Sequence, residues 1–418
     1  MSGYSEIPII GLISMTSGNN KPLSIAAYTY SSCLGFGNAA NWQAMLAETS
    51  GLTPCEFTGA NDLPTWVGQM QHLDTPLPEH LKEYECRNNR LAYLALQQDN
   101  FLKKAEEAVA RLGAERVGIY MGTSTSGILQ TEEAYAQALQ QGVDTLPDSY
   151  QYRTTHNVAS LAYFVQNILQ TRGPVLAIST ACSSSAKVFA SAARAIRAGI
   201  IDAAIVGGVD SLCLTTLYGF HSLQLVSPNP CTPFDQNRTG ISIGEAGGFA
   251  LLTRDSCHQH YLLGYGESSD AYHMSSPHPA GDGAYAAMKQ ALASAKLMPI
   301  DIDYINLHGT GTQANDSAEA AAVTRAFGDL TPASSTKGWT GHTLGAAGII
   351  EICIGLQAIE NQYLPKNLGL KTPHADMSLA LVTQGRPAAI KRVLSNSFGF
   401  GGSNCSVIVG QPEVITHA

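Results

Sequence analysis

The chain is poor in charge, and the charge that it has is mainly negative. Asp, Glu, Lys and Arg make up 14% of its 418 residues, and the formal net charge is −9. Phosphate binding needs a basic face, so this balance argues against nucleic acid as the main partner. A hydrophobic content of 44% with so little charge is typical of a compact globular protein, and the length suffices for about two or three domain-sized units.

Paired cysteines are missing, and so is a long apolar run near the start. The nine cysteines are scattered with no Cys-x-x-Cys pair, which fits neither a disulfide framework nor a zinc site. We therefore expect a reducing, cytoplasmic location and no metal. The apolar run from Ile7 to Met15 is too short to span a bilayer and lacks a basic flank, so no membrane span is expected.

The most informative stretch runs from Val175 to Ala186. It predicts a short apolar strand over 175–178, a tight elbow at Cys182 and a small-residue helix that ends near Ala198. A cysteine at the start of a helix lies near unpaired backbone N–H groups, which favour the thiolate, the nucleophilic form. The alternative is a structural cysteine, because cysteine is among the most buried residue types.

The rest of the chain alternates apolar strands with helices of about ten residues or more. This order predicts an α/β fold in which helices flank a parallel sheet. Residues 334–356 resemble the cysteine elbow in outline, with a Ser-Thr strand end, a loop and an apolar helix. We therefore expect an internal duplication into halves of residues 1–255 and 256–418. A further strand is expected at residues 9–15.

Two histidines follow predicted strand ends in the second half. His308 precedes Gly-Thr-Gly-Thr312, and His342 lies just before a long apolar helix. A lone histidine is more often a surface residue or a satisfied core residue than a catalyst. Two histidines in such loops, together with Cys182, favour nucleophilic and acid–base catalysis.

Acidic residues in the same half need partners. Glu351 falls in an otherwise apolar helix, where an isolated charge is costly, and Lys337 is the nearest cation in sequence. Asp316 and Glu319 lie one turn apart on another predicted helix and could share this lysine. For Asp316 and Glu319, a solvated helix face is the simpler interpretation.

A glycine-dense stretch with two aromatic rings, Phe398 to Gly402, precedes the last predicted strand. Backbone of this kind can approach a substrate closely and can offer bare N–H groups as an oxyanion hole. A simple turn explains the same residues equally well.

Four motifs in this order resemble those of the β-ketoacyl-acyl carrier protein synthases of the elongating type, which use one cysteine and two histidines. They are Thr180-Ala-Cys-Ser-Ser184, His308-Gly-Thr-Gly-Thr312, Lys337 with Gly341-His342, and Asn396-Ser-Phe-Gly-Phe-Gly-Gly-Ser-Asn404. The resemblance runs from about Leu23 to the end. It implies the thiolase fold, in which two duplicated halves form a five-layered α/β/α/β/α sandwich, usually as a dimer.

The resemblance also implies a mechanism. Cys182 would take an acyl chain from a carrier-protein thioester. His308 and His342 would promote decarboxylation of a malonyl thioester and stabilise the resulting enolate. The backbone N–H groups of Cys182 and Phe400 would hold the thioester oxygen, and Phe400 would also act as a gate.

Further roles are implied for residues around this centre. Lys337 would hold the histidines in place together with three carboxylates, those of Asp316, Glu319 and Glu351. Thr310 and Thr312 would contact the phosphopantetheine arm. The resemblance implies no metal and no diffusible cofactor, because the substrate travels on acyl carrier protein. The second subunit would be another copy of the chain or a paralogue that lacks the cysteine.

Two positions depart from the family pattern. Thr239-Gly-Ile241 stands where relatives commonly have Asp-Gly-Phe, so Ile241 would replace a phenylalanine beside the malonyl group. The loop 123–126, which lines the acyl tunnel in relatives, is unusually hydroxylated and includes Thr125. Both departures favour a specialised synthase that makes a polyketide or an aryl polyene-like chain.

Three alternatives remain open. A chain-length-factor-like partner subunit keeps the fold but loses the nucleophile. The presence of Cys182 with both histidines argues against this alternative. A thiolase would use a second cysteine, yet Cys353 and Cys405 lack a comparable loop. A starter-unit synthase would pair cysteine with one histidine and an asparagine, and His342 stands where that enzyme would differ.

Overall fold

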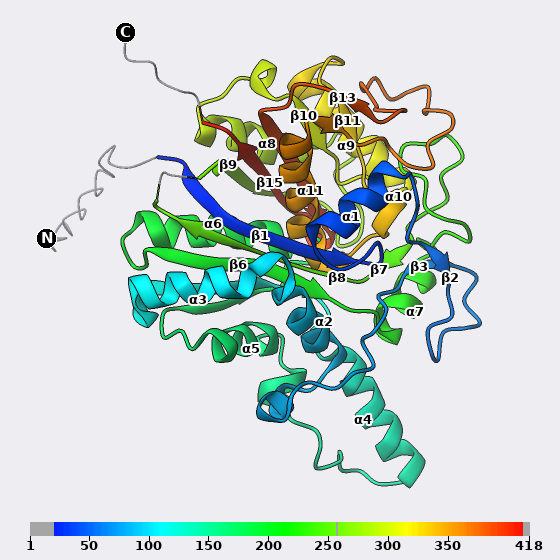
Figure 1. The fold of residues 1–418 in the computed structure, drawn as a ribbon. Helices are drawn as coiled ribbons and strands as arrows, with labels where there is room; N and C mark the ends of the chain where they lie inside the picture. Colours follow the sequence, from blue (N-terminus) through cyan, green and yellow to red (C-terminus); the bar gives the residue numbers. More distant parts are fainter. Residues whose placement is uncertain (1–20, 256–257, 413–418) are drawn as a thin grey trace, which may run out of the picture.

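The computed structural model describes residues 21–255 and 258–412, so the strand predicted at 9–15 lies outside the described residues. Ten strands form one mixed sheet in the order β11-β10-β14-β15-β9-β1-β8-β6-β4-β5. In chain order they are β1 (Leu23–Ser32), β4 (Val117–Gly122), β5 (Val175–Ile178), β6 (Ala203–Asp210), β8 (Ala246–Thr253), β9 (His260–Ser269), β10 (Tyr304–Asn306), β11 (Ala333–Ser334), β14 (Arg392–Gly399) and β15 (Ser403–Gly410). Figure 1 shows β1 running beside β8 near the middle of the molecule.

The sheet consists of two five-stranded groups with the same topology. β1 and β9 join them by antiparallel pairing of Leu23–Ile25 with residues 260–262. Outward from this junction, the orders are β1-β8-β6-β4-β5 and β9-β15-β14-β10-β11. Each group has two antiparallel pairings followed by two parallel ones. This repetition supports an internal duplication, while the division at residue 255 stays a prediction.

The predicted parallel sheet is therefore only partly right. Strands β4, β5 and β6 are parallel, as are their counterparts β10, β11 and β14. β14 and β15, in contrast, are joined by three residues, Phe400–Gly402, and pair antiparallel. So short a connection permits a hairpin but not the crossover that parallel strands require.

Helices complete five layers. The middle layer contains α6 (Ser184–Arg197) and α11 (Ala347–Asn361), which contact each other and strands of both groups. The outer layers lie on opposite sides of the molecule (Figure 1). Their helices are α2 (Arg87–Leu96), α3 (Phe101–Leu112) and α5 (Ser160–Leu169) against the first group, and α8 (Asp282–Ala295) and α9 (Gln313–Phe327) against the second.

The segment 344–361, which ends with α11, is long and apolar enough to cross a membrane. However, 89% of it is buried inside the molecule. A helix that is hydrophobic all round belongs either in a protein core or in a membrane, and here it packs between the two groups of strands. We therefore interpret it as a core helix.

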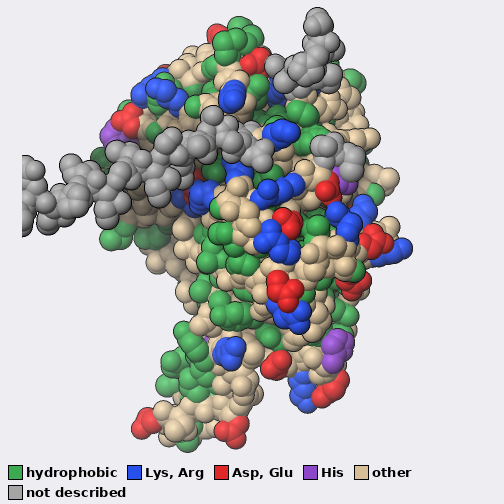
Figure 2. Space-filling model, turned by 90° about the vertical axis from the view of Figure 1, so that its left-hand side faces the viewer, with side chains coloured by type: hydrophobic (Ala, Val, Ile, Leu, Met, Phe, Trp, Pro, Cys, Tyr) green, Lys and Arg blue, Asp and Glu red, His purple; other side chains and the backbone are tan. Residues whose placement is uncertain are grey.

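The remaining elements lie at the periphery and around the site. They are the helices α1 (Gly37–Leu46), α4 (Ile128–Gln141), α7 (Leu214–Ser222) and α10 (Lys337–Thr340), and the short strands β2 (Thr53–Pro54), β3 (Trp66–Gly68), β7 (Ile243–Gly244), β12 (Tyr363–Leu364) and β13 (Arg386–Pro387). α4 projects away from the body of the molecule (Figure 1). Acidic and basic side chains are interspersed on the face drawn in Figure 2.

Candidate active site

Cys182 lies at the elbow between β5 and α6, where the sequence predicts it. The preceding residue, Ala181, has a φ of +52°, a left-handed conformation that is uncommon for a residue with a side chain. Ser184 holds this turn, because its hydroxyl donates to the Ala181 carbonyl and accepts the Thr180 N–H at 2.9 Å. The elbow thereby presents the Cys182 sulfur to a pocket.

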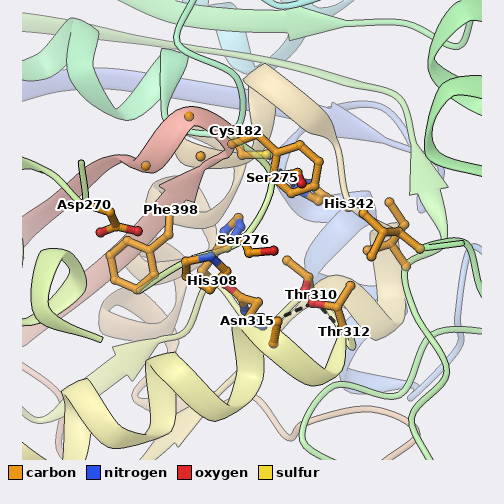
Figure 3. Close-up of a pocket in the computed structure, with 18 of the residues that line it drawn as sticks. Cys182, Asp270, Ser275, Ser276, His308, Thr310, Thr312, Asn315, His342 and Phe398 are labelled. Carbon is orange, nitrogen blue, oxygen red and sulfur yellow. Dashed lines mark hydrogen bonds between the residues drawn. The ribbon is translucent and has the colours of Figure 1, made fainter. Parts of the chain in front are cut away.

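Two histidines from the second half converge on this sulfur (Figure 3). His342 Nε2 lies 3.0 Å from Cys182 Sγ, and the His308 and His342 ring centroids are 5.2 Å apart. All three side chains are buried, and their ligand atoms lie within 4.8 Å of one another. Within the described residues, this is also the group whose spacing could hold a metal ion, and a Cys/His/His set has the ligand chemistry of Zn²⁺.

The backbone around His342 determines which ring nitrogen carries the proton. The Leu344 N–H donates to His342 Nδ1 at 3.2 Å, so a neutral ring must carry its proton on Nε2, facing the cysteine. β7 holds the residue itself, because the His342 N–H donates to Ser242 O at 2.7 Å and the Gly244 N–H donates to His342 O at 3.0 Å.

Both imidazoles are neutral near pH 7. Burial lowers the pKa of His308 and His342 well below 6.5, and the positive charge of Lys337 lowers both further. A neutral imidazole has one N–H donor, which suits it to polarise a carbonyl oxygen without giving up a full proton.

Lys337 is buried beneath the histidines. Its ammonium pairs with the Glu351 carboxylate, donates to the His308 carbonyl and lies 3.4 Å from His308 Nδ1. The ion pair that the sequence predicts between Lys337 and Glu351 is therefore present. Burial raises the pKa of Glu351, and the lysine opposes that rise.

Glu319 holds the His308 loop through backbone groups. Its two carboxylate oxygens accept the N–H groups of His308 at 2.8 Å and Gly309 at 2.7 Å. Asn396 donates to the same carboxylate at 3.2 Å. Burial raises the pKa of Glu319 to about 7, while these donors lower it.

The expectation that Asp316 and Glu319 share Lys337 is wrong. Asp316 instead accepts the N–H groups of Phe234 at 2.8 Å and Gly311 at 3.2 Å, and it lies 3.4 Å from Arg238 Nε. Arg238 is fully buried, and nothing in the sequence pattern points to it, because its partner is 78 positions away. A buried carboxylate is stabilised by whichever cation lies beside it in the fold, and that cation can come from a distant part of the sequence.

The β14–β15 turn packs directly on the elbow. A Cβ added at Gly399 would lie 2.8 Å from Thr180 O and 3.3 Å from Cys182 N, so only glycine permits this contact. The next residue, Phe400, directs its backbone N–H to the Cys182 sulfur. The N–H groups of Cys182 and Phe400 thus lie beside the same sulfur.

The expectation of a stabilised thiolate needs correction. Burial raises the pKa of Cys182 to about 11, even though Lys337 and the Phe400 N–H lower it. Desolvation therefore outweighs the lysine and the backbone donors, and the resting sulfur is a thiol.

The pocket brings together most of the residues predicted from the resemblance. Besides the three reactive side chains, its lining includes Ile241, Thr310, Thr312 and Phe400. The Thr310 and Thr312 hydroxyls lie 2.9 Å apart at the start of α9 (Figure 3). The Phe400 ring contacts Phe220, with centroids 5.5 Å apart.

Thr125 does not line this pocket. It is buried, and its hydroxyl donates to Asp210 at 2.9 Å. Asp210, at the end of β6, is a residue that the sequence analysis missed. The sequence does contain a signal for Asp210, because it is a carboxylate that ends an apolar strand shortly after Gly207 and Gly208.

Comparisons with known proteins agree with this geometry. The family model described as "Beta-ketoacyl synthase, N-terminal domain" matches residues 9–258, and "Beta-ketoacyl synthase, C-terminal domain" matches residues 261–371. The chain is 31% identical to "3-oxoacyl-[acyl-carrier-protein] synthase 2" of Coxiella burnetii, over 88% of this chain and 94% of that protein. It is 32% identical to "Nodulation protein E" of Rhizobium leguminosarum bv. trifolii, over 89% of this chain and 94% of that protein.

A solved structure is also similar. The match is to a chain of "Ketosynthase (ApeO) in Complex with its Chain Length Factor (ApeC)" from Xenorhabdus doucetiae, with a TM-score of 0.86 and 38% identity. It covers 93% of this chain and 98% of that one. The predicted thiolase fold is thereby confirmed. Since the family models match well over half of the sequence, the chain belongs to the β-ketoacyl synthase family.

Proposed function

We propose that this protein is a β-ketoacyl-acyl carrier protein synthase, an acyltransferase that extends an enzyme-bound acyl chain with a malonyl unit. The observation that carries the proposal is the 3.0 Å approach of His342 Nε2 to Cys182 Sγ, with His308 beside both in one buried pocket. A cysteine and two neutral imidazoles provide one nucleophile and two hydrogen-bond donors.

The first half-reaction is acyl transfer. The Cys182 sulfur attacks the carbonyl of an acyl-carrier-protein thioester, and the phosphopantetheine thiol leaves with the proton that Cys182 loses. The N–H groups of Cys182 and Phe400 stabilise the charge on the carbonyl oxygen in the transition state. Burial disfavours a free thiolate at Cys182, and the neutral thioester places no charge on the buried sulfur.

The second half-reaction is decarboxylative condensation. His308 and His342 donate hydrogen bonds to the thioester oxygen of malonyl-acyl carrier protein, which favours loss of carbon dioxide and holds the enolate. The enolate carbon attacks the acyl-Cys182 carbonyl, and the carbon–sulfur bond breaks. The sulfur takes up a proton, and β-ketoacyl-acyl carrier protein departs.

The surrounding residues support these steps. Lys337 with Glu351, and Glu319 and Asp316 through the loop N–H groups, keep the two imidazoles in place. Thr310 and Thr312 lie on the pocket wall, where they would contact the phosphopantetheine arm.

We further propose a specialised pathway, in which the product is a polyketide or aryl polyene-like chain. Ile241 in the pocket supports this choice. The partners would be acyl carrier protein and a second thiolase-fold subunit, in a homodimer or in a heterodimer with a cysteine-less paralogue. The similarity to a ketosynthase–chain length factor complex supports the heterodimer. We keep the cytoplasmic location as a prediction.

Mass spectrometry of Cys182 after incubation with a panel of acyl-acyl carrier proteins tests the function. We expect an acyl adduct on Cys182, followed by a β-ketoacyl product when malonyl-acyl carrier protein is added. Cys182→Ala should remain folded and make neither. No adduct from any chain length, or elongation by Cys182→Ala, would contradict the proposal; the first result would favour a non-catalytic partner subunit.

A further inference from the structure

Asp210 is a fully buried carboxylate outside the pocket. It lies at the end of β6 and accepts hydrogen bonds from two segments of the chain, the loop 123–125 and the turn after His342. The donors are the hydroxyls of Thr123 (2.6 Å), Ser124 and Thr125 (2.9 Å), and the N–H groups of Ser124 (2.8 Å), Thr125 (3.0 Å) and Gly345 (2.6 Å).

The contact with Gly345 reaches the catalytic histidine in two steps. Gly345 follows Leu344, whose N–H donates to His342 Nδ1 at 3.2 Å. Leu344 has a φ of +53°, which costs a residue with a side chain about 1–3 kcal/mol and persists only where neighbours impose it. A Cβ at Gly345 would lie 2.8 Å from Asp210 Oδ2, so the turn and the carboxylate are in close contact.

We propose that Asp210 is a positioning residue for His342. By holding Gly345, it keeps Leu344 in the left-handed conformation, directs the Leu344 N–H at His342 Nδ1, and so keeps the His342 proton on Nε2, facing Cys182 and the substrate. The catalytic consequence rests on the proposed function, but the position of the proton does not.

A second contact strengthens the argument. The Ser124 hydroxyl donates to Asp210 and also accepts the Gly345 N–H at 3.2 Å. The hydroxyl-rich loop 123–125 therefore holds the carboxylate so that it is aimed at the turn. This gives those hydroxyls a role distinct from contact with an acyl chain, because Thr125 does not line the pocket.

Asp210→Asn tests the proposal. The amide would place its NH₂ group where the Gly345 N–H now donates, and two donors facing each other repel. We expect ¹⁵N NMR of histidine-labelled protein to show protonation of His342 Nδ1 in a substantial fraction of molecules. In a Cys182→Gln background, the kcat for malonyl-acyl carrier protein decarboxylation should fall about tenfold with KM unchanged, because the residue touches no substrate.

Asp303→Asn is the matched control. The Asp303 carboxylate also accepts two backbone N–H groups, those of Lys391 at 2.8 Å and Arg392 at 2.9 Å, but at the opposite end of β14 from the site. It should leave the His342 signal and kcat unchanged. If Asp210→Asn does not fold, Ser124→Ala takes its place, with an expected fall in kcat of about threefold.

The NMR signal separates this proposal from the proposed function, because it needs no substrate. A folded Asp210→Asn protein whose His342 Nδ1 stays unprotonated would overturn the positioning role. So would an unchanged kcat in Ser124→Ala, or an equal loss in Asp303→Asn, which would assign Asp210 to stability alone.

Discussion

At the scale of single residues, burial controls the chemistry of this site. Burial raises the pKa of the Cys182 thiol and lowers the pKa of both histidines, so each group favours its neutral form. Lys337 adds to the effect on the histidines and opposes the effect on the cysteine. The Lys337–Glu351 pair lies beneath the site, and the three reacting groups above it are neutral in the resting protein.

In decarboxylation by Cys182→Gln, a mimic of the acylated state, the two histidines should contribute no pH dependence between pH 8 and pH 6. Both remain neutral, whereas an unperturbed histidine would become mostly charged below about pH 6.5. A change in rate over this range should follow Glu319 and Glu351, whose pKa values burial raises to about 7. Carbon dioxide release from malonyl-acyl carrier protein measures this rate.

The double variant Cys182→Gln/His342→Ala is the control and should be inactive throughout that range. A ¹⁵N signal of His308 or His342 that titrates with a midpoint near pH 6.5 would show that burial does not lower the pKa of that histidine. Intact malonyl-acyl carrier protein after incubation with Cys182→Gln would remove the two-histidine role altogether.

Arg87 and Glu245 form a buried ion pair, with Nη2–Oε1 and Nε–Oε2 distances of 2.6 and 2.9 Å. Arg87→Met should lower the free energy of unfolding by about 3–5 kcal/mol, because it leaves the Glu245 charge buried without a cation. Urea denaturation measures the loss. Lys82→Met, which breaks the exposed pair with Glu79, should cost less than about 1 kcal/mol. Equal losses would mean that Glu245 finds another partner.

At the scale of elements, the site forms where three strand ends meet. β5 leads into the Cys182 elbow, β10 leads into the His308 loop, and the β14–β15 turn brings Phe400 against both. The two groups of strands have the same order, in which β5 corresponds to β11, and the segments that follow these two strands carry Cys182 and His342. Strand ends that converge in this way are typical of ligand sites in α/β folds.

Gly399→Ala should reduce condensation by about 100-fold. The new Cβ would lie 2.8 Å from Thr180 O, so the β14–β15 turn must move away from the elbow and the two N–H groups beside Cys182 would separate. Steady-state kinetics with acyl- and malonyl-acyl carrier protein measure the effect.

Gly219→Ala, in α7, is the matched control. A Cβ at Gly219 would meet nothing within 4 Å, so the activity of this variant should stay constant. The free energy of unfolding is then compared between the two alanine variants. We expect Gly219→Ala to stabilise the helix by about 0.5–1 kcal/mol. Full activity of Gly399→Ala would show that condensation does not require the close contact between the β14–β15 turn and the Cys182 elbow.

At the scale of the whole molecule, the ten-stranded sheet ends on one side at a strand that carries an exposed apolar side chain. β5 is the last strand of the first group, and its Leu176 is 44% exposed. The projecting helix α4 exposes Tyr135 and Leu139. An unpaired strand with an apolar side chain in solvent is a template for pairing with another chain.

If the proposed dimer forms through the β5 edge, Leu176→Lys should weaken it, because the substitution would place a charge between the two subunits. Light scattering after size-exclusion chromatography should show a mass near that of one chain for the variant, and near twice that for the unmodified protein at the same concentration. Leu330→Lys, between α9 and β11, is an equally drastic change at a more exposed leucine and should leave the mass unchanged. A Leu176→Lys protein that stays dimeric would place the interface elsewhere.

Much of the local structure follows from sequence pattern alone. The strand 175–178 and the helix after Cys182 are present as predicted, because apolar runs, small residues and a glycine stop act over a few neighbouring positions. The same holds for β10 before His308 and for the long helix that contains Glu351. The motifs around Cys182, His308 and His342 also suffice to indicate the family.

The sequence by itself thus determined the elements, the family and the identity of the reactive side chains. Only the tertiary structure decided strand direction, the Arg238 partner of Asp316, the link from Asp210 to His342, and the thiol state of Cys182. The physical reason is range. Local patterns act through neighbours along the backbone, whereas pairing across a sheet and loss of water around a charge depend on which distant segments pack together, as Cys182 and His342 do across 160 positions.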